Sequence, residues 1–434
     1  MNGKKVYIKT YGCQMNVHES EKMYAQFEKE GFTFAESMNT ADIIVFNTCC
    51  IREGAETRVI GNLGIAKKLK EKNRNLIIAI CGCMTQQSGM AEYLHSRCPF
   101  VNVITGTFGV GKIVDYIKLA GNSYFSDICI DESIPHGINE AKRSGEANNY
   151  VNIMYGCDNF CTYCIVPYVK GRERSRRLID IKNEVAELIS HGAKEITLLG
   201  QNVNSFRDED GNDFFALLSS LSHLDGDYWI KFLTSHPKDL SEEAIKLIGS
   251  EEKLANYVHL PLQSGSDKIL SEMNRKYSVK EYLKKIEWIK KYIPDAGITS
   301  DVIIGFPGET DEDFEQTMSL TKDIEFNNLF MFLYSIRKGT PAAEMQNQVP
   351  ESIKKERIAR LIKQQSKIEN ELAKQHVGKT LKVLCDNDSE GKFSAKSGND
   401  KPIIIENGKK GMLNRFFEVK ITQAVGSKLY GNIK

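Results

Sequence analysis

The chain has 434 residues, of which 41% are hydrophobic and 26% charged, a composition ordinary for a globular protein of about two to four domains. No apolar run approaches the roughly 20 residues that a membrane helix needs, and no secretory signal is visible at the N-terminus. We therefore expect a cytoplasmic protein without membrane association. Its 11 cysteines are then expected to be free thiols, metal ligands or catalytic groups rather than disulfides.

The first part of the chain alternates strand-like runs with amphipathic helical stretches. One such stretch is expected to be a helix that starts at Ser20 and stops at Gly31. The alternation predicts a mostly parallel sheet in an N-terminal α/β domain over residues 1–120. The expected strands, rich in valine and isoleucine, are residues 5–12, 41–49 and 75–83.

A polar stretch, roughly residues 132–149, interrupts this pattern, and we assign residues 121–149 to a linker. The alternation then resumes and predicts a partial TIM-like (β/α)6 barrel over residues 150–375, closed by a charged helical stretch at 351–374. The expected barrel strands are residues 150–156, 195–200, 229–234, 257–262, 298–305 and 328–334.

The last segment, residues 376–434, changes character to short strands separated by Gly, Asn and Asp, which predicts a small all-β barrel. Residues 377–434 contain 11 Lys/Arg against 6 Asp/Glu, although the whole chain has a net charge of only +1. This basic module is either a docking surface for a polyanion or an ordinary solvated surface. The expected strands are residues 380–386, 402–407, 415–425 and 428–433.

Three cysteines with the spacing C-x3-C-x2-C follow the first expected barrel strand: Cys157, Cys161 and Cys164. Structural zinc wants four ligands, and no nearby Cys or His completes such a set convincingly. A [4Fe–4S] cluster held by three thiolates fits better, and it leaves one iron open to bind another molecule.

This motif at the end of the first strand of a (β/α)6 barrel resembles the radical S-adenosylmethionine (SAM) superfamily. The resemblance implies that the open iron binds SAM, which one electron cleaves to methionine and a 5′-deoxyadenosyl radical. It also places Tyr163 near the adenine of SAM. Matches at later strand ends, where barrel active sites are built, imply further SAM contacts, although each alone could be ordinary turn chemistry. They are Gly200, Gln201, Asn202, Gln263, Ser264, Asp301, Gly305 and Glu309.

A second set of cysteines lies at the ends of the three N-terminal strands: Cys13, Cys49 and Cys83. The carboxyl ends of parallel strands share one edge of a sheet, so these thiols are expected to meet at a second three-thiolate iron–sulfur site. Cys50 is expected to point to the opposite side in extended chain, and Cys81 to be packing inside its strand.

The segments TYGCQMN, NTCCIREGAE, CGCMTQ, HLPLQSGS and TSDVIIGFPGETDEDF resemble the methylthiotransferases over nearly the whole chain. This resemblance extends to a terminal domain similar to the TRAM RNA-binding module. Within the family, Gln14 and Met15 resemble the branch that modifies isopentenylated adenosine in tRNA. Other branches modify threonylcarbamoylated adenosine or an aspartate of a ribosomal protein. The departures from the pattern are Cys50 and Lys170, and neither removes a cluster ligand.

The resemblance implies an enzyme that uses two [4Fe–4S] clusters and two molecules of SAM to place a methylthio group on carbon 2 of N6-isopentenyladenosine. The target lies immediately 3′ to the anticodon, at tRNA position 37, in a loop whose base can be splayed out. The implied partners are the anticodon stem-loop, an electron-donating reductase of the flavodoxin or ferredoxin kind, and the iron–sulfur assembly machinery.

A basic run leaves the cysteine loop and is placed to hold anticodon phosphates: Arg172, Arg174, Arg176 and Arg177. The alternative is a charged helix entry on the surface. Two functional alternatives also stay open. One is the threonylcarbamoyladenosine branch of the same chemistry, and the other is a non-enzymatic iron–sulfur regulator that binds RNA.

Overall fold

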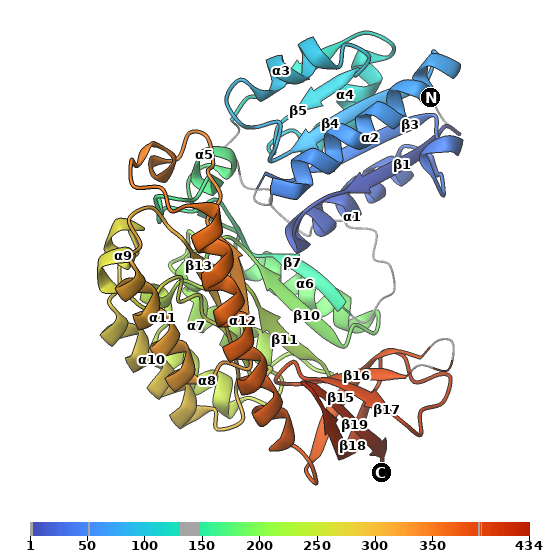
Figure 1. The fold of residues 1–434 in the computed structure, drawn as a ribbon. Coiled ribbons are helices and arrows are strands. Elements are labelled where there is room, and N and C mark those ends of the chain that lie inside the picture. The colour runs from blue at the N-terminus through green and yellow to red at the C-terminus, as the bar shows by residue number, and fades with distance from the viewer. Residues whose placement is uncertain (1–2, 51–52, 131–132, 134–147, 389–390, 392) are drawn as a thin grey trace. The chain divides into compact units, whose positions relative to one another are not determined.

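The computed structural model describes the whole chain except residues 1–2, 51–52, 131–132, 134–147, 389–390 and 392 (Figure 1). Most of the predicted linker therefore lies outside the described residues. The chain forms two compact units. The first consists of Met1–Ser144, Met154–Asp158 and Ile165–Arg176, and the second of Gly145–Ile153, Asn159–Cys164 and Arg177–Lys434.

The first unit contains a parallel sheet with the strand order β2-β1-β3-β4-β5-β6. Its two central strands, β3 and β4, are buried at every position, as expected for a parallel sheet covered on both faces. The strands are β1 (Lys5–Thr10), β2 (Thr33–Phe34), β3 (Ile43–Thr48), β4 (Ile77–Gly82), β5 (Val103–Thr105) and β6 (Phe125–Asp127).

Helices cover both faces of this sheet, and the alternation of side chains along β3 shows how. Ile43 and Val45 share one core with Phe27 and Ile117, from α1 and α4. Ile44, the residue between them, faces the opposite core, which α2 and α3 supply. The helices are α1 (Gln14–Lys29), α2 (Glu53–Lys72), α3 (Met90–Arg97) and α4 (Ile113–Ala120). The α/β class of this domain is thus confirmed.

Some boundaries in this part of the chain differ from the sequence-based expectations. Helix α1 begins at Gln14, six residues before the expected Ser20. Ser20 does not cap the helix, because its hydroxyl is buried and bonds to Thr10 Oγ1 at 2.7 Å and Asn47 Nδ2 at 2.9 Å. The sheet also continues through β6, which lies within the segment 121–149 that we assigned to the linker.

The second unit contains the six parallel strands of the predicted partial barrel. They form two three-stranded sheets, β7-β10-β11 and β12-β13-β14, and an isolated parallel bridge joins Ile230 of β11 to Leu254. The strands are β7 (Asn148–Asn152), β10 (Glu195–Leu199), β11 (Trp229–Phe232), β12 (Tyr257–His259), β13 (Gly297–Ile304) and β14 (Asn328–Leu333).

Each barrel strand from β10 onward is reached through helical chain, and two helix starts show why the elements begin where they do. Ser278 with Glu281, and Thr310 with Asp313, form reciprocal capping boxes at α10 and α11. The helices are α6 (Leu178–Ser190), α7 (Phe214–Ser222), α8 (Glu242–Ser250), α9 (Asp267–Glu272), α10 (Val279–Tyr292), α11 (Asp311–Ile324) and α12 (Glu351–Lys374). In the first unit, β8 (Met154–Tyr155) pairs antiparallel with β9 (Arg174–Ser175), and α5 (Val166–Lys170) lies between them in the chain.

The predicted C-terminal barrel is confirmed as a closed barrel with the order β15-β16-β17-β19-β18. Its core includes Val383, Ile403 and Val419. The sequence pattern missed β16, because its four residues, SAKS, carry little apolar signal. The strands are β15 (Thr380–Asn387), β16 (Ser394–Ser397), β17 (Pro402–Ile405), β18 (Phe416–Val425) and β19 (Lys428–Ile433).

A buried ionic network joins this small barrel to the larger one within the second unit. Lys231 lies 2.9 Å from Glu195 and 2.5 Å from Asp400, and Lys396 lies 2.7 Å from the other oxygen of Glu195. Burial raises the pKa of Glu195, but the two ammonium groups lower it overall, so the carboxylate stays charged. The basic C-terminal module is therefore fixed to the strands that build the larger barrel.

No described helix is long and apolar enough to cross a membrane.

Candidate functional site

The three cysteines predicted for the N-terminal domain each follow a strand of its sheet. Cys13, Cys49 and Cys83 follow β1, β3 and β4, which are consecutive neighbours in one parallel sheet. Cys49 and Cys83 are buried, and Cys13 is partly exposed. Cys13 also occupies the N-cap position of α1, where backbone N–H groups favour negative charge.

The loop that carries Cys13 passes directly over Cys49. Gly12 has φ +115°, and a Cβ at this position would lie 2.4 Å from Cys49 Cβ and 2.8 Å from its Sγ. Only glycine combines this backbone conformation with so close an approach. The contact places the ends of β1 and β3 close together, as a common thiolate site requires.

Cys50 does not point away from this site as the sequence analysis expected. It is 1% exposed and packs with Cys83, Ile165 and Val169 in one buried cluster of the first unit. The expectation assumed extended chain, but the backbone bends at Cys50 as it leaves β3. The hydrogen bond between the two thiols raises the pKa of Cys50 and lowers that of Cys83, so Cys83 is the thiol that ionises.

Lys170, the other departure from the family pattern, belongs to the same neighbourhood. Burial lowers the pKa of its ammonium group, but the charges of Cys83, Glu19 and Cys13 raise it overall. A partly buried cation therefore accompanies the thiols. Such a charge compensates a site that collects several thiolates.

Among the described residues, no three His, Cys, Asp or Glu side chains are arranged to hold a single metal ion. A four-iron cluster is much larger than one ion, so its thiolate ligands stand farther apart than the ligands of an ion. The donor chemistry does fit a cluster, since three thiols follow adjacent strand ends with the partly buried cation of Lys170 nearby.

The cysteines of the C-x3-C-x2-C motif share one loop of the chain. Cys157 belongs to the first unit, where its N–H donates to Gly171 O at 3.2 Å. Cys161 and Cys164 belong to the second unit, and the N–H of Cys164 donates to Cys161 O at 2.9 Å. Cys157 and Cys161 are buried and Cys164 is partly exposed.

Residues that follow α9 hold the loop around Cys161. Thr162 donates its N–H to Met273 O at 3.1 Å and accepts a hydrogen bond from Ala342 N–H at 2.9 Å. Asn274 Nδ2 donates to the carbonyl of Phe160 at 2.9 Å. These bonds fix the backbone that carries two of the three thiols.

Arg275 is a site residue that the sequence analysis missed. Its Nη1 donates to Cys161 Sγ at 3.3 Å, and its Nε to Tyr277 Oη at 3.2 Å. The side chain is buried, and its Nη2 has no partner among the described residues. Nothing in the local sequence NRKY signals this role, because the contact spans 114 positions of the chain.

Tyr163, the predicted adenine neighbour, packs edge-on against Phe306 with ring centroids 6.5 Å apart. Both belong to an apolar cluster with Ile269 and Ile303 in the second unit. Burial raises the pKa of Tyr163 well above its ordinary value, so its phenol remains neutral. The residue therefore offers an aromatic surface rather than a charge.

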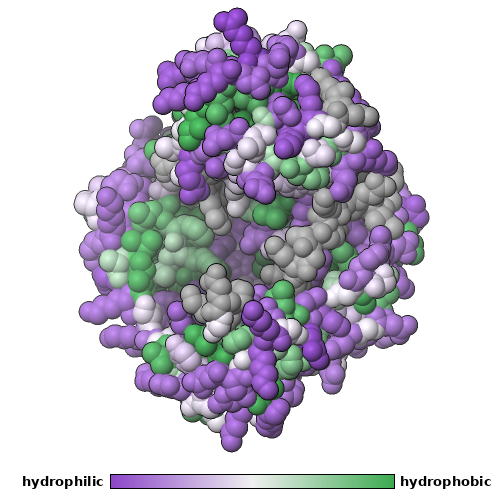
Figure 2. Space-filling view, turned by 90° about the vertical axis from the view of Figure 1, so that its right-hand side faces the viewer, coloured by the Kyte–Doolittle hydropathy of each residue, from purple (hydrophilic) through white to green (hydrophobic). Residues whose placement is uncertain are grey.

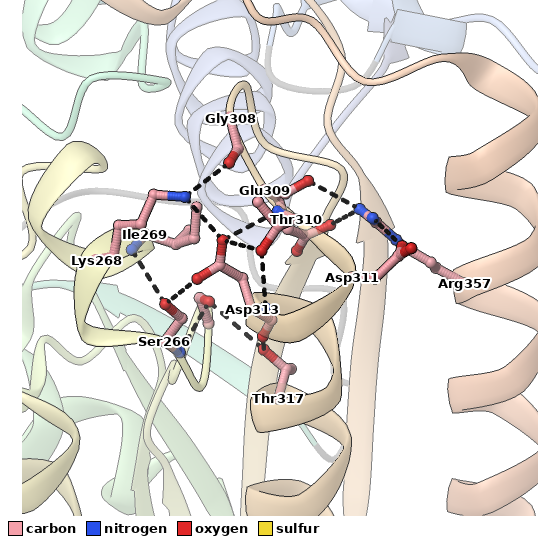
Figure 3. A network of polar contacts seen from close by, with 11 residues as sticks. Ser266, Lys268, Ile269, Gly308, Glu309, Thr310, Asp311, Asp313, Thr317 and Arg357 are labelled. Carbon is pink, nitrogen blue, oxygen red and sulfur yellow. Dashed lines mark hydrogen bonds and ion pairs between the residues drawn. The ribbon is translucent and has the colours of Figure 1, made fainter.

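The predicted SAM loops at Gln263–Gly265 and Gly305–Glu309 are tied to each other by a polar network (Figure 3). Asp313 accepts hydrogen bonds from Ser266 Oγ at 2.7 Å and Lys268 Nζ at 2.9 Å, and Lys268 also reaches Gly308 O at 3.0 Å. Asp313 thereby joins the start of α9 to the start of α11 and fixes both loops.

Glu309 and Ser264 are engaged within the protein. Glu309 Oε2 accepts from the N–H of Gly305 at 2.8 Å and lies 2.7 Å from Arg357 Nη1, while Ser264 is buried 3.5 Å from Thr317 Oγ1. Burial raises the pKa of Glu309 despite Arg357. Their SAM contacts stay predictions, and the structure shows that both also shape the loops.

The loop after β10 carries the predicted Gly200, Gln201 and Asn202. Thr234 Oγ1 donates to Gly200 O at 2.7 Å, and Asn202 Nδ2 donates to Asp239 Oδ2 at 2.7 Å. Several buried polar atoms of this region have no partner among the described residues: Asn202 Oδ1, both amide atoms of Asn204, Ser235 Oγ and His236 Nε2. Such atoms require a polar partner from outside the chain, which a bound ligand or an ordered water supplies.

His236 and Asp301 are two further polar residues of the predicted SAM region. Burial and the nearby charge of Arg275 lower the pKa of His236 to about 2, so its imidazole is neutral. Asp301 lies on β13, with Oδ2 3.4 Å from His259 Nε2, and its carbonyl accepts from the N–H of Gln263 at 2.8 Å.

The basic run divides into exposed and buried members. Arg172 and Arg177 have side chains 62% and 43% exposed and lie near Asp158 and Glu209. Arg174 stacks over Phe108 with its Nη2 donating to Lys170 O at 3.2 Å. Arg176 is only 1% exposed, so the predicted open contact with RNA does not fit it, because a buried guanidinium offers no face to a phosphate.

Comparison with known proteins supports this reading. Residues 151–321 match the radical SAM superfamily, and residues 5–106 match the uncharacterized protein family UPF0004. The radical SAM methyltransferase TsrM of Kitasatospora setae superposes with a TM-score of 0.58 at 13% identity, over 90% of this chain and 80% of that one. At this identity the likeness shows the fold alone. The fold and the cysteine motif are those of the radical SAM enzymes.

More similar relatives refine this class. The tRNA-2-methylthio-N6-dimethylallyladenosine synthase of Clostridium tetani is 46% identical over 432 residues, which cover 98% of this chain and 95% of that protein. The enzyme of the same name from Caldicellulosiruptor saccharolyticus is 45% identical, over 100% and 93%. The chain therefore belongs to the family of tRNA-2-methylthio-N6-dimethylallyladenosine synthases. The expectation of a methylthiotransferase enzyme is confirmed.

Proposed function

We propose that this protein replaces the hydrogen on carbon 2 of N6-isopentenyladenosine in tRNA by a methylthio group, giving 2-methylthio-N6-isopentenyladenosine at the position 3′ to the anticodon. The full-length identity to synthases of this product carries the proposal. Two sets of three cysteines at strand ends supply the ligands that such chemistry needs.

The protein uses two [4Fe–4S] clusters and SAM, which when bound supply a 5′-deoxyadenosyl radical, a sulfur atom and a methyl group. Carbon 2 of adenine is unactivated, so a cofactor must carry the hard step. The hydrogen removed from the base ends on 5′-deoxyadenosine, and two molecules of SAM are consumed for each product.

Cys13, Cys49 and Cys83 hold the sulfur-donating cluster in this proposal. Gly12 lets the Cys13 loop approach Cys49, Cys50 donates a hydrogen bond to Cys83, and Lys170 supplies a partly buried positive charge. Hydrogen bonds and charge around the sulfurs are among the means by which a protein sets the potential of a cluster.

Cys157, Cys161 and Cys164 hold the cluster that binds SAM, and Arg275 orients Cys161 and offsets its charge. The SAM molecule contacts Tyr163, Gly200, Gln201, Asn202, Gln263 and Asp301, with Ser264, Gly305 and Glu309 shaping the loops that hold it. The unpartnered atoms of Asn202 and Asn204 among the described residues are suited to the polar ends of this molecule.

The tRNA partner is held through its anticodon stem-loop. Arg172 and Arg177 are the exposed members of the basic run and contact phosphates, which give affinity without sequence preference. The C-terminal barrel, with 11 Lys/Arg against 6 Asp/Glu from residue 377 onward, adds positive potential. The substrate places the enzyme in the cytoplasm, with a flavodoxin-like or ferredoxin reductase and the iron–sulfur assembly machinery as further partners.

Mass spectrometry of tRNA nucleosides from a deletion strain tests this function. Loss of 2-methylthio-N6-isopentenyladenosine, restored by the wild-type gene but not by a Cys161→Ala variant, is the expected result. Loss of only the threonylcarbamoyl derivative would assign the chain to that other acceptor. Reduced enzyme that forms no 5′-deoxyadenosine from SAM would instead indicate the regulator.

A further inference from the structure

The inner surface of the barrel carries exposed aromatic rings on β14. The burial of β14 alternates: Leu329 is 3% exposed, whereas Phe330 and Phe332 are 42% and 46% exposed. Helix α12 packs against β14, and Leu329 shares its buried face with Val302 of β13. Successive residues of a strand point to opposite faces, so the two phenylalanines lie on the face turned away from the helices.

The strand register identifies the neighbours of these rings. Phe330 pairs with Asp301, and His259 pairs with Thr299, two residues earlier on β13. Because this spacing preserves the side of the sheet, His259, Asp301 and Phe330 share one face. The ring of His259 packs edge-on against Phe330, with centroids 5.9 Å apart. We call Phe330, Phe332 and His259 the aromatic platform.

Polar contacts hold the imidazole of this platform in place. Its Nδ1 lies 2.9 Å from Thr299 Oγ1, which in turn donates to Tyr257 Oη at 3.0 Å. Its Nε2 lies 3.4 Å from Asp301 Oδ2. An ordered imidazole and a carboxylate thus lie on the same sheet face as two phenylalanine rings that are 42% and 46% exposed.

Exposed aromatic rings that lie together on one face of a sheet often mark a ligand site, because large apolar surfaces are otherwise covered in a folded chain. Figure 2 shows apolar residues exposed among hydrophilic ones on the face in view. The platform also adjoins the loops proposed to hold SAM, since the Asp301 carbonyl accepts from the N–H of Gln263. A base that reacts with a SAM-derived radical must lie close to these loops.

We propose that the aromatic platform binds the flipped target adenine of tRNA and its apolar N6 substituent, and so selects isopentenylated over unmodified adenosine. This inference rests on the proposed function. Aromatic side chains stack on splayed-out RNA bases, and the five-carbon isopentenyl group matches the second phenylalanine ring. Asp301 accepts the single N6–H of the alkylated base, and His259 positions that carboxylate.

The adenine of SAM is the other ring that could stack here, and the test separates the two. The probes are synthetic anticodon stem-loops that carry either N6-isopentenyladenosine or adenosine at the target position. Binding to the anaerobic, fully loaded enzyme is followed by fluorescence anisotropy, and SAM affinity is measured separately. Phe330→Ala and Phe332→Ala are compared with Phe215→Ala, a control on α7 with a similarly exposed phenylalanine (41%).

The wild type is expected to bind the isopentenylated stem-loop more tightly. Phe330→Ala and Phe332→Ala are each expected to weaken that binding about tenfold and to abolish the preference, while SAM affinity and the Phe215→Ala control stay at the wild-type level. Unchanged preference in both platform variants overturns the inference, as does a loss of SAM affinity in its place.

A different result would contradict the proposed function itself. A wild-type enzyme that produces no methylthio nucleoside from either stem-loop contradicts the function itself. Product formation by the wild type, together with undiminished isopentenyl preference in the platform variants, contradicts only the role of the platform.

Discussion

The two cysteine sets are built in opposite ways. Cys13, Cys49 and Cys83 are separated by more than 30 residues each, and the register of three neighbouring parallel strands unites them. Cys157, Cys161 and Cys164 lie on one short loop, and hydrogen bonds from Asn274 and Arg275 fix it. The first site therefore depends on the whole sheet, and the second on a few contacts to the loop.

The largest effect that separates the two sites is expected from replacing the loop cysteines. A variant with alanine at Cys157, Cys161 and Cys164 should lose all formation of 5′-deoxyadenosine yet keep about half of the iron and sulfide, because in the proposed function each site holds one four-iron cluster. Anaerobic iron and sulfide analysis beside the wild type measures this. Loss of all iron would contradict two independent sites.

Gly12→Ala tests how strongly the first site depends on backbone geometry. The new Cβ meets Cys49 at 2.4 Å in a left-handed conformation, so we expect about 1–3 kcal/mol of strain and loss of the sulfur-donating cluster. Gly64→Ala is the control. A Cβ there meets nothing within 4 Å inside α2, and this change should stabilise the protein by about 0.5–1 kcal/mol.

Thermal unfolding and the iron content of both glycine variants provide the comparison. A Gly12→Ala protein that keeps its full iron content and wild-type stability would show that the Cys13 loop can move away from Cys49.

Arg275→Gln tests how the contacts to the loop of Cys157, Cys161 and Cys164 influence the cluster proposed there. Removing a positive charge that donates to Cys161 Sγ should make the SAM-binding cluster harder to reduce, by about 60 mV for each tenfold change in a one-electron equilibrium. An anaerobic redox titration followed by electron paramagnetic resonance gives the potential. Arg360→Gln, a surface change near Glu315, should leave it unaltered.

Cys50→Ala is expected to have a smaller effect of the same kind on the other cluster. It removes a weak S–H donor to Cys83 inside a buried cluster, so the potential of the sulfur-donating cluster should fall, while Cys50→Ser restores a donor and most of the potential. Equal potentials for the alanine and serine variants would show that this hydrogen bond does not influence the potential of the cluster.

The smallest effect is expected at the surface. Replacing Arg172 and Arg177 by glutamine should weaken tRNA binding and reduce the slope of log affinity against log salt by about two, because each contact releases counterions. Filter binding between low and physiological salt measures the slope. An unchanged slope would exclude both residues as phosphate contacts.

The same contrast explains how much could be predicted from the sequence. Runs such as Ile43–Thr48 are so apolar that strand, sheet and strand-end cysteines follow directly. Local spacing revealed the loop cysteines. By contrast, Arg275 contacts Cys161 across 114 positions, and Cys50 turns toward Cys83 because the backbone bends there; no local pattern encodes either contact. Arg176 lies in a basic stretch that is typical of a protein surface, but its side chain is buried.

The most direct test of the central claim is a variant with alanine at Cys13, Cys49 and Cys83, supplied with SAM, reductant and an isopentenylated anticodon stem-loop. If these thiols hold only the sulfur-donating cluster, the variant retains about half of the iron and forms 5′-deoxyadenosine, but produces no 2-methylthio-N6-isopentenyladenosine. Formation of the methylthio product by this variant would contradict the assignment of the sulfur-donating site to the edge of the N-terminal sheet.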